Sequence, residues 1–157
     1  MQIPASIRPV GAAHIEATVF AKTFADAIIL THDNKILLQQ RPAAWSRAAG
    51  CLTTFGGHIE AGETPPQALI RELKEELGAD VKEAALISLG AITEATTNHT
   101  ELVHGFFWHD SDNTITGCYE CEAVYYARMA GALAHPKIMD YVVWHLHICR
   151  ERGLITA

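Results

Sequence analysis

Residues 57–79 carry the strongest local signals in the chain, and their sequence is GHIEAGETPPQALIRELKEELGA. The segment predicts a helix with both ends marked. Thr64 is a favourable N-cap residue, Pro65 suits the first helical position, and Gln67 can complete a capping box. Gly78 predicts the C-terminal end, because glycine readily adopts the left-handed conformation that closes many helices. The helix is therefore specified locally, before any tertiary contact is considered.

Three carboxylates are expected on one face of this helix. At about 100° per residue, Glu72, Glu75 and Glu76 fall within an arc of roughly 100°. Glu72 and Glu76 are like charges four residues apart, and such a pair destabilises an isolated helix by roughly a few tenths of a kcal/mol. The face is either a solvated acidic surface or a site for hard divalent cations, which bind several oxygen ligands. The carboxylates alone leave both interpretations open.

Composition narrows the class of protein. The chain has 157 residues, of which 49% are hydrophobic, and 18 Asp and Glu against 12 Lys and Arg give a net charge of −6. These values predict one soluble globular domain over residues 1–157. The acid excess disfavours long nucleic acid and anionic membrane surfaces as partners, because both require a basic face. No secretory signal or membrane-spanning segment is evident, so we expect a cytoplasmic protein.

Short apolar and β-rich segments indicate a mixed α/β domain. Strands are expected at residues 13–20, 25–31, 35–41, 51–55, 86–92, 102–108 and 123–127. Asp33 and Asn34 supply turn chemistry between the second and third of these. Helices are expected at residues 64–77 and 137–151, and a loop at residues 41–50.

The spacing within residues 57–79 resembles the signature of the Nudix hydrolase family. Five residues separate Gly57 from Glu63, and seven more precede the run RELKEELG at residues 71–78. An apolar residue normally closes the motif, and Ala79 stands there. A chance match of its seven fixed residues at a given start is on the order of one in 10⁸. The resemblance implies an α/β/α sandwich with a mixed β-sheet, and an activity like that of the nucleoside triphosphate pyrophosphohydrolases.

The resemblance also implies a metal-dependent hydrolase that cleaves the pyrophosphate linkage of a nucleoside diphosphate joined to another moiety. The expected cofactor is Mg²⁺, with Mn²⁺ as the alternative. The implied metal ligands are the three helix carboxylates and a backbone carbonyl, namely Gly57, Glu72, Glu75 and Glu76. Arg71 and Glu63 are implied to form the ion pair that orients these carboxylates.

A base must take the proton of the attacking water. The resemblance implies either a motif glutamate, for which Glu75 is the candidate, or a carboxylate in a later loop. The later candidates are Glu101, Glu120 and Glu122. Glu120 is preferred because it precedes the strand at residues 123–127, as an extra glutamate does in several nucleotide-cleaving members of the family. An ordinary surface glutamate is the competing interpretation.

Departures from the family pattern bear on the substrate. Phe55 stands where many members have proline. Residues 89–98 contain neither the proline typical of ADP-ribose cleavers nor the tyrosine typical of dinucleoside polyphosphate cleavers. These absences favour a nucleoside triphosphate, cleaved to a nucleoside monophosphate and pyrophosphate. The alternatives are a nucleotide-sugar or other diphosphate-conjugate hydrolase and, in another class, a catalytically silent nucleotide-binding regulator.

Two further features complete the set of candidates. Arg41, Trp45 and Arg47 offer cations and an aromatic ring that could hold a phosphate or stack on a base, although a plain surface loop would contain the same residues. Cys118 and Cys121 form a CxxC pair that could be half of a zinc site, but four free thiols are the simpler interpretation. The expected partner is a small nucleotide or nucleoside diphosphate conjugate, and the sequence leaves a homodimer open. The histidines are treated as structural or surface residues.

Overall fold

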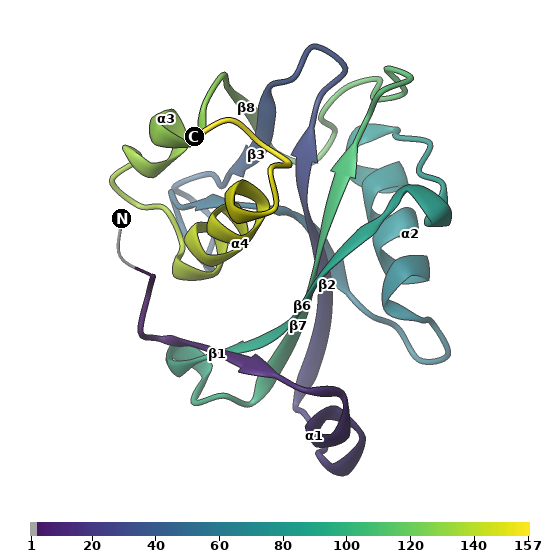
Figure 1. The fold of residues 1–157 in the computed structure, drawn as a ribbon, viewed down its shortest axis with the longest axis vertical. Coiled ribbons are helices and arrows are strands. Elements are labelled where there is room, and N and C mark those ends of the chain that lie inside the picture. The colour runs from purple at the N-terminus through teal and green to yellow at the C-terminus, as the bar shows by residue number, and fades with distance from the viewer. Residues whose placement is uncertain (1–2) are drawn as a thin grey trace.

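The computed structural model describes residues 3–157 and is built on an eight-stranded mixed sheet (Figure 1). The strands are β1 (Ile7–Val10), β2 (Lys22–Leu30), β3 (Ile36–Gln40), β4 (Leu52–Thr53), β5 (Phe55–His58), β6 (Ile87–Glu94), β7 (Glu101–His109) and β8 (Glu122–Tyr126). Their main order is β1-β6-β7-β2-β3-β4, while β5 pairs with β2 and β8 pairs with β3. Strands β2 and β7 run parallel, and the other pairs are antiparallel.

The helices cover both faces of this sheet. They are α1 (Ala12–Ala17), α2 (Pro65–Leu77), α3 (Met129–Leu133) and α4 (Asp140–Glu151), with 3₁₀ turns η1 (Glu83–Ala85) and η2 (Ala95–Thr97). Figure 1 shows α2 and α4 on opposite sides of the central strands. The expected α/β/α sandwich is confirmed. None of the helices within residues 3–157 is both long and apolar enough to cross a bilayer.

Alternation along the central strands creates two cores. Ala25, Ala27 and Ile29 of β2 are buried against the α2 side, where they join the apolar face of that helix. Ile28, on the other face of β2, joins Leu146 and the rest of the α4 side. Because β2 is covered on both faces, it is a nearly continuous apolar run, as strands in the middle of an α/β sandwich usually are.

Helix α2 has the ends that its sequence predicts. The Thr64 hydroxyl accepts a hydrogen bond from the Gln67 backbone N–H at 3.2 Å, and the Gln67 side chain accepts one from the Thr64 N–H at 3.0 Å. These two bonds complete the capping box, with Pro65 at the first helical position. Gly78 closes the helix in the left-handed conformation, with φ of 64°. Local chemistry therefore fixes where α2 begins and ends.

The expectation of a strand at residues 13–20 is wrong. Residues 12–17 form α1, whose sequence AAHIEA is rich in good helix formers and buries no residue. Strand β1 was not foreseen, because it contains Pro9, which cannot donate to a strand ladder. The proline is tolerated because β1 lies at the edge of the sheet. Helix α3 was also missed, since its MAGAL sequence shows no clear period.

Two predicted elements are shifted by tertiary pairing. The strand expected at residues 51–55 divides at Thr54, so that β4 pairs with β3 and β5 pairs with β2. The second long helix begins at Asp140 rather than at Lys137. The residues before it are held extended, because the Leu52 N–H donates to the Lys137 carbonyl and the Leu52 carbonyl accepts from the Met139 N–H. The other five predicted strands are present, with ends shifted by one to three residues.

Gly56 gives a test of this architecture. Its φ is 144°, and an added Cβ would lie 2.2 Å from the Ala25 carbonyl oxygen, an atom of the β2 backbone. We expect Gly56→Ala to lower the free energy of unfolding by at least about 2 kcal/mol, because backbone cannot yield as a flexible side chain can. Gly62→Ala is the matched control. Gly62 also has positive φ, but an added Cβ there would have no atom of residues 3–157 within 4 Å. Only backbone strain of about 1 kcal/mol is therefore expected. Equal losses in urea unfolding would contradict the packing argument.

Candidate functional site

The acidic face of α2 lies against β5, and Glu76 is its most buried member. Glu76 is only 5% exposed, and its Oε2 accepts a hydrogen bond from the Gly56 N–H at 3.1 Å. Burial, reinforced by the nearby charge of Glu72, raises the pKa of Glu76 to about 8. This carboxyl group is therefore tied to the β5 backbone, and its charged form is poorly compensated.

Gly57 brings a second carboxylate close to the same backbone. A Cβ on Gly57 would lie 2.6 Å from Cδ of Glu72, so a residue with a side chain would displace that carboxylate. Burial also raises the pKa of Glu72. The contact between α2 and β5 thus gathers two carboxylates and the peptide groups of two glycines in one small region.

Arg71 organises the remaining acidic groups. Its guanidinium grips Glu63 with two hydrogen bonds, 2.8 Å from Nε and 2.9 Å from Nη2, and holds the pKa of Glu63 near 2. Nη1 lies 2.9 Å from Glu72 Oε1 and 3.7 Å from Glu75 Oε1. Nη2 also donates to the His58 carbonyl oxygen at 3.0 Å. One arginine therefore connects the loop before α2, the end of β5 and the acidic face of the helix.

The donor set suits a hard divalent cation. Carboxylate oxygens and peptide carbonyls are the ligands that such ions prefer, and Glu72 and Glu76 lie where a positive charge would relieve their mutual repulsion. Within residues 3–157 no three Asp, Glu, His or Cys side chains already converge closely enough to hold an ion. Arg71 occupies part of the acidic face instead, so metal binding requires Glu72 and Glu75 to turn from this guanidinium.

Glu120 lies near the acidic face, on the loop before β8. This loop is fastened to the end of α2, because the Tyr119 N–H donates to the Glu76 carbonyl and the Thr116 N–H donates to the Leu77 carbonyl, each at 2.9 Å. The charge of Glu120 contributes to the raised pKa of Glu76. Glu122, another candidate base, is an exposed residue at the start of β8.

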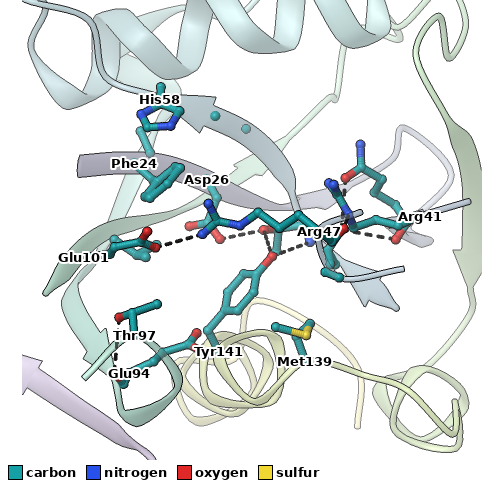
Figure 2. Close-up of a pocket in the computed structure, with 18 of the residues that line it drawn as sticks. Phe24, Asp26, Arg41, Arg47, His58, Glu94, Thr97, Glu101, Met139 and Tyr141 are labelled. Atoms are coloured by element: carbon teal, nitrogen blue, oxygen red, sulfur yellow. Dashed lines mark hydrogen bonds and ion pairs between the residues drawn. The ribbon is translucent and has the colours of Figure 1, made fainter. Parts of the chain in front are cut away.

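A cavity of about 650 Å³ opens on the other side of β5 (Figure 2). Its walls come from β2, β5, the turn between β6 and β7, the loop at residues 41–50 and the start of α4. Arg41 and Arg47 line it, as does the backbone of Gly56 and Gly57. Trp45 is not among the lining residues, and its ring lies 4.5 Å from the Arg41 guanidinium.

Arg47 extends across this cavity, as Figure 2 shows. Its Nη2 lies 2.8 Å from Glu101 Oε2, and its guanidinium carbon lies 5.2 Å from the centroid of the Phe24 ring. Phe24 in turn packs against His58, with 4.3 Å between ring centroids. Glu101, a candidate base from the sequence, is therefore engaged by an arginine at the cavity and does not lie with the carboxylates of α2. The cavity combines a cation, a carboxylate and an aromatic pair.

The floor of the cavity contains buried polar groups that sequence reasoning missed. Asp26 is 6% exposed and accepts a hydrogen bond from the Thr54 hydroxyl at 2.5 Å. Its other oxygen, Oδ1, has no hydrogen-bond partner among residues 3–157. Burial raises the pKa of Asp26 to about 7 and lowers the pKa of His145, 3.9 Å away, to about 4. Tyr141 and Glu94 face the same region. An aspartate within the apolar run at residues 25–31 was the available signal.

Comparisons with known proteins agree with the fold. The family model described as "NUDIX domain" matches residues 22–140. A curated relative, the CTP pyrophosphohydrolase of Escherichia coli (strain K12), is 34% identical over 116 residues, which cover 70% of this chain and 78% of the relative. The match extends well beyond the segment at residues 57–79.

Two solved structures show the same fold. The solution structure of the E. coli ORF135 protein matches with a TM-score of 0.60 and 27% identity, over 84% of this chain and 91% of its own. A bifunctional NMN adenylyltransferase/ADP ribose pyrophosphatase from Francisella tularensis matches with a TM-score of 0.62 and 16% identity, over 88% of this chain and 44% of its own. The second was crystallised with AMP and a Mn ion, whereas its likeness to this chain concerns the fold alone.

Asp26 makes the stability of the chain depend on pH. Its pKa is about 7 in the fold against an ordinary value of 3.8, so the folded state binds the proton more tightly. Wild type should therefore lose stability relative to Asp26→Asn as pH rises from about 4 to about 7, by roughly 2–4 kcal/mol in total. Asparagine retains an acceptor for the Thr54 hydroxyl, and His145 is unchanged in both proteins.

Urea unfolding of wild type and Asp26→Asn at pH 4.5, 6 and 8 measures this difference. Asp112→Asn, at an exposed turn position, is the control and should give a difference that stays constant with pH. A constant offset for Asp26→Asn as well would show that the buried carboxyl does not titrate in this range.

Proposed function

Because the chain belongs to the Nudix family of hydrolases, which cleave phosphorus anhydrides in nucleoside diphosphate derivatives, we propose that its substrate is a nucleoside triphosphate. The products would be a nucleoside monophosphate and pyrophosphate. The observation that carries this proposal is that β5 lies between the cavity and the acidic face of α2. Gly56 and Gly57 line the cavity and also contact Glu76 and Glu72.

This placement supports separate roles, in which the cavity binds the nucleoside and the acidic face of α2 holds the metal. A nucleoside in the cavity would place its phosphate chain toward the two glycines, which present only backbone to the cavity. The E. coli relative is named as a CTP pyrophosphohydrolase, and CTP is a nucleoside triphosphate. Arg47, which lies over the Phe24 ring, would contact a base or a phosphate. Arg41 lines the same cavity and could do the same. Trp45 would act indirectly, by packing against Arg41.

The proposed metal ligands are the carboxylates of Glu72, Glu75 and Glu76 and the carbonyl of Gly57. A bound Mg²⁺ or Mn²⁺ would neutralise phosphate oxygens and acidify a coordinated water. Arg71 holds Glu63 in two hydrogen bonds and thereby fixes the loop that precedes α2. This ion pair is a positioning device, because its groups contact the carboxylates of the helix and the backbone of β5.

Glu120 is the proposed base. It sits on a loop bonded to the last turn of α2, near enough to influence the pKa of both Glu72 and Glu76. Glu120 would take a proton from the water that attacks phosphorus, and the leaving pyrophosphate would depart with the bridging oxygen. Glu75 is the alternative base, since it is the half-exposed member of the acidic face.

Glu76→Gln tests the site assignment. The substitution removes one charge while an oxygen remains to accept from the Gly56 N–H, so we expect turnover with Mg²⁺ to fall by at least about 100-fold. The melting temperature should be equal or higher, because the substitution removes a buried carboxyl whose charged form is poorly compensated. Glu83→Gln, at an exposed residue of η1, is the control. Near-normal turnover of the Glu76 variant would refute the assignment.

A substrate panel tests the reaction itself. Wild type would be assayed with nucleoside and deoxynucleoside triphosphates, ADP-ribose and nucleotide sugars, in Mg²⁺ or Mn²⁺, with all phosphate products identified. The highest kcat/KM is expected for a triphosphate, and pyrophosphate should appear without orthophosphate. Faster cleavage of a conjugate would instead indicate a diphosphate-conjugate hydrolase. Tight nucleotide binding without any turnover would indicate a regulator.

A further inference from the structure

The CxxC pair has no role in the proposed reaction, although the structure brings its sulfurs into contact. Cys118 Sγ lies 3.5 Å from Cys121 Sγ and 2.9 Å from the Cys121 carbonyl oxygen, to which the thiol donates. The Gln39 side-chain amide donates to Cys121 Sγ at 3.0 Å. Both cysteines are partly buried beside the α2 core and retain some exposure to solvent.

The pair spans the turn that carries Glu120. Hydrogen bonds from Thr116 and Tyr119 fasten this turn to the last residues of α2, and Gln39 connects it to β3. The turn is therefore held on both sides while its two sulfurs face each other. Among residues 3–157 no further Asp, Glu, His or Cys joins them in a cluster able to hold an ion, whereas a structural zinc needs four ligands.

We propose that Cys118 and Cys121 form a reversible dithiol/disulfide site whose oxidant is a low-molecular-weight disulfide. A disulfide bond is about 2.05 Å long, so the two sulfurs need to approach by only about 1.5 Å within a single turn. The other two cysteines lie outside this turn: Cys149 is fully buried in the α4 core, and Cys51 immediately precedes β4. The inference does not depend on the substrate proposed above.

The reaction is a two-step thiol–disulfide exchange. The Cys118 thiolate attacks one sulfur of the small disulfide, which forms a mixed disulfide and releases one small thiolate. The Cys121 thiolate then attacks the Cys118 sulfur, closes the protein disulfide and releases the second small thiolate. The two protons lost by the cysteines end on the two released thiols. Burial raises the pKa of Cys121 and so keeps its thiolate fraction small, but the second step is intramolecular, between sulfurs that already lie 3.5 Å apart.

Closure would change the turn beside the acidic face. The thiol hydrogen bond from Cys118 to the Cys121 carbonyl is lost, and residues 118–121 become a covalent ring. The Tyr119 N–H, which donates to the Glu76 carbonyl, lies inside this ring. Its exchange with solvent should slow by several-fold on oxidation, because the ring removes open conformations of the turn.

The test titrates the full chain with mixtures of reduced and oxidised glutathione in the presence of a chelator, followed by intact mass and peptide mapping. Wild type should lose about 2 Da, with the bond mapped to Cys118 and Cys121, and dithiothreitol should reverse it. Cys121→Ser should instead accumulate an adduct of about 305 Da on Cys118. Cys51→Ser is the control and should behave like wild type. Hydrogen exchange at Tyr119 reports closure separately from catalysis.

Three outcomes would overturn the proposal. One is a wild-type protein that keeps all four thiols across the titration. Another is a stable glutathione adduct on wild-type Cys118, which would show that Cys121 cannot reach it. The third is a stoichiometric zinc in the purified protein that both Cys→Ser variants lose, which would identify the pair as metal ligands. Because each readout is mass or metal content, failure here is distinct from failure of the hydrolase assay.

Discussion

The contact between α2 and β5 is the constraint on which the rest of the site depends. Phe55 of β5 packs in the apolar core with α2, but at the two glycines that follow it the contact is polar. Glu76 reaches the Gly56 N–H, and Gly57 leaves room for the Glu72 carboxylate. An ordinary helix–strand contact would be apolar at this point. The cost of burying two acidic groups is offset in part by Arg71, whose grip on Glu63 fixes the approach to the helix. Five glutamates against one arginine and one lysine in residues 57–79 account for half of the net charge of −6.

Sequence predicted best those features that neighbouring residues determine. Helix α2 begins at Pro65 and ends before Gly78 because its caps lie within the same segment, and the family resemblance rests on the same residues. Prediction failed where a distant segment decided the outcome. Thr54 divides a predicted strand because β4 and β5 pair with different partners, and α4 starts late because its preceding residues pair with Leu52. Residues 12–17 show the opposite error, in which apolar residues favoured a strand although the segment forms a helix that buries none of them.

The candidate site divides in the same way. The carboxylates of α2 and the Arg71–Glu63 pair could be located from spacing, because one helix and one loop carry them all. The cavity could not be located in this way, since its walls come from segments as far apart in the sequence as Phe24 and Tyr141. Asp26 and Tyr141 come close together only in the folded chain. Arg41 and Arg47 were anticipated as substrate contacts and do line the cavity, whereas Trp45 packs behind Arg41. The roles of all these residues remain predictions.

Gly56 and Gly57 separate the cavity from the acidic helix by the thickness of one peptide strand. The residues that would choose a substrate and the residues that would act on it therefore occupy opposite sides of a thin partition and share almost no side chains. Substitutions at Arg47, Glu94 or Phe24 can reshape the cavity without moving the carboxylates of α2. With this layout, substrate selectivity can change while the carboxylates of α2 stay the same. The fold is therefore a favourable starting point for directed evolution toward new leaving groups or bases.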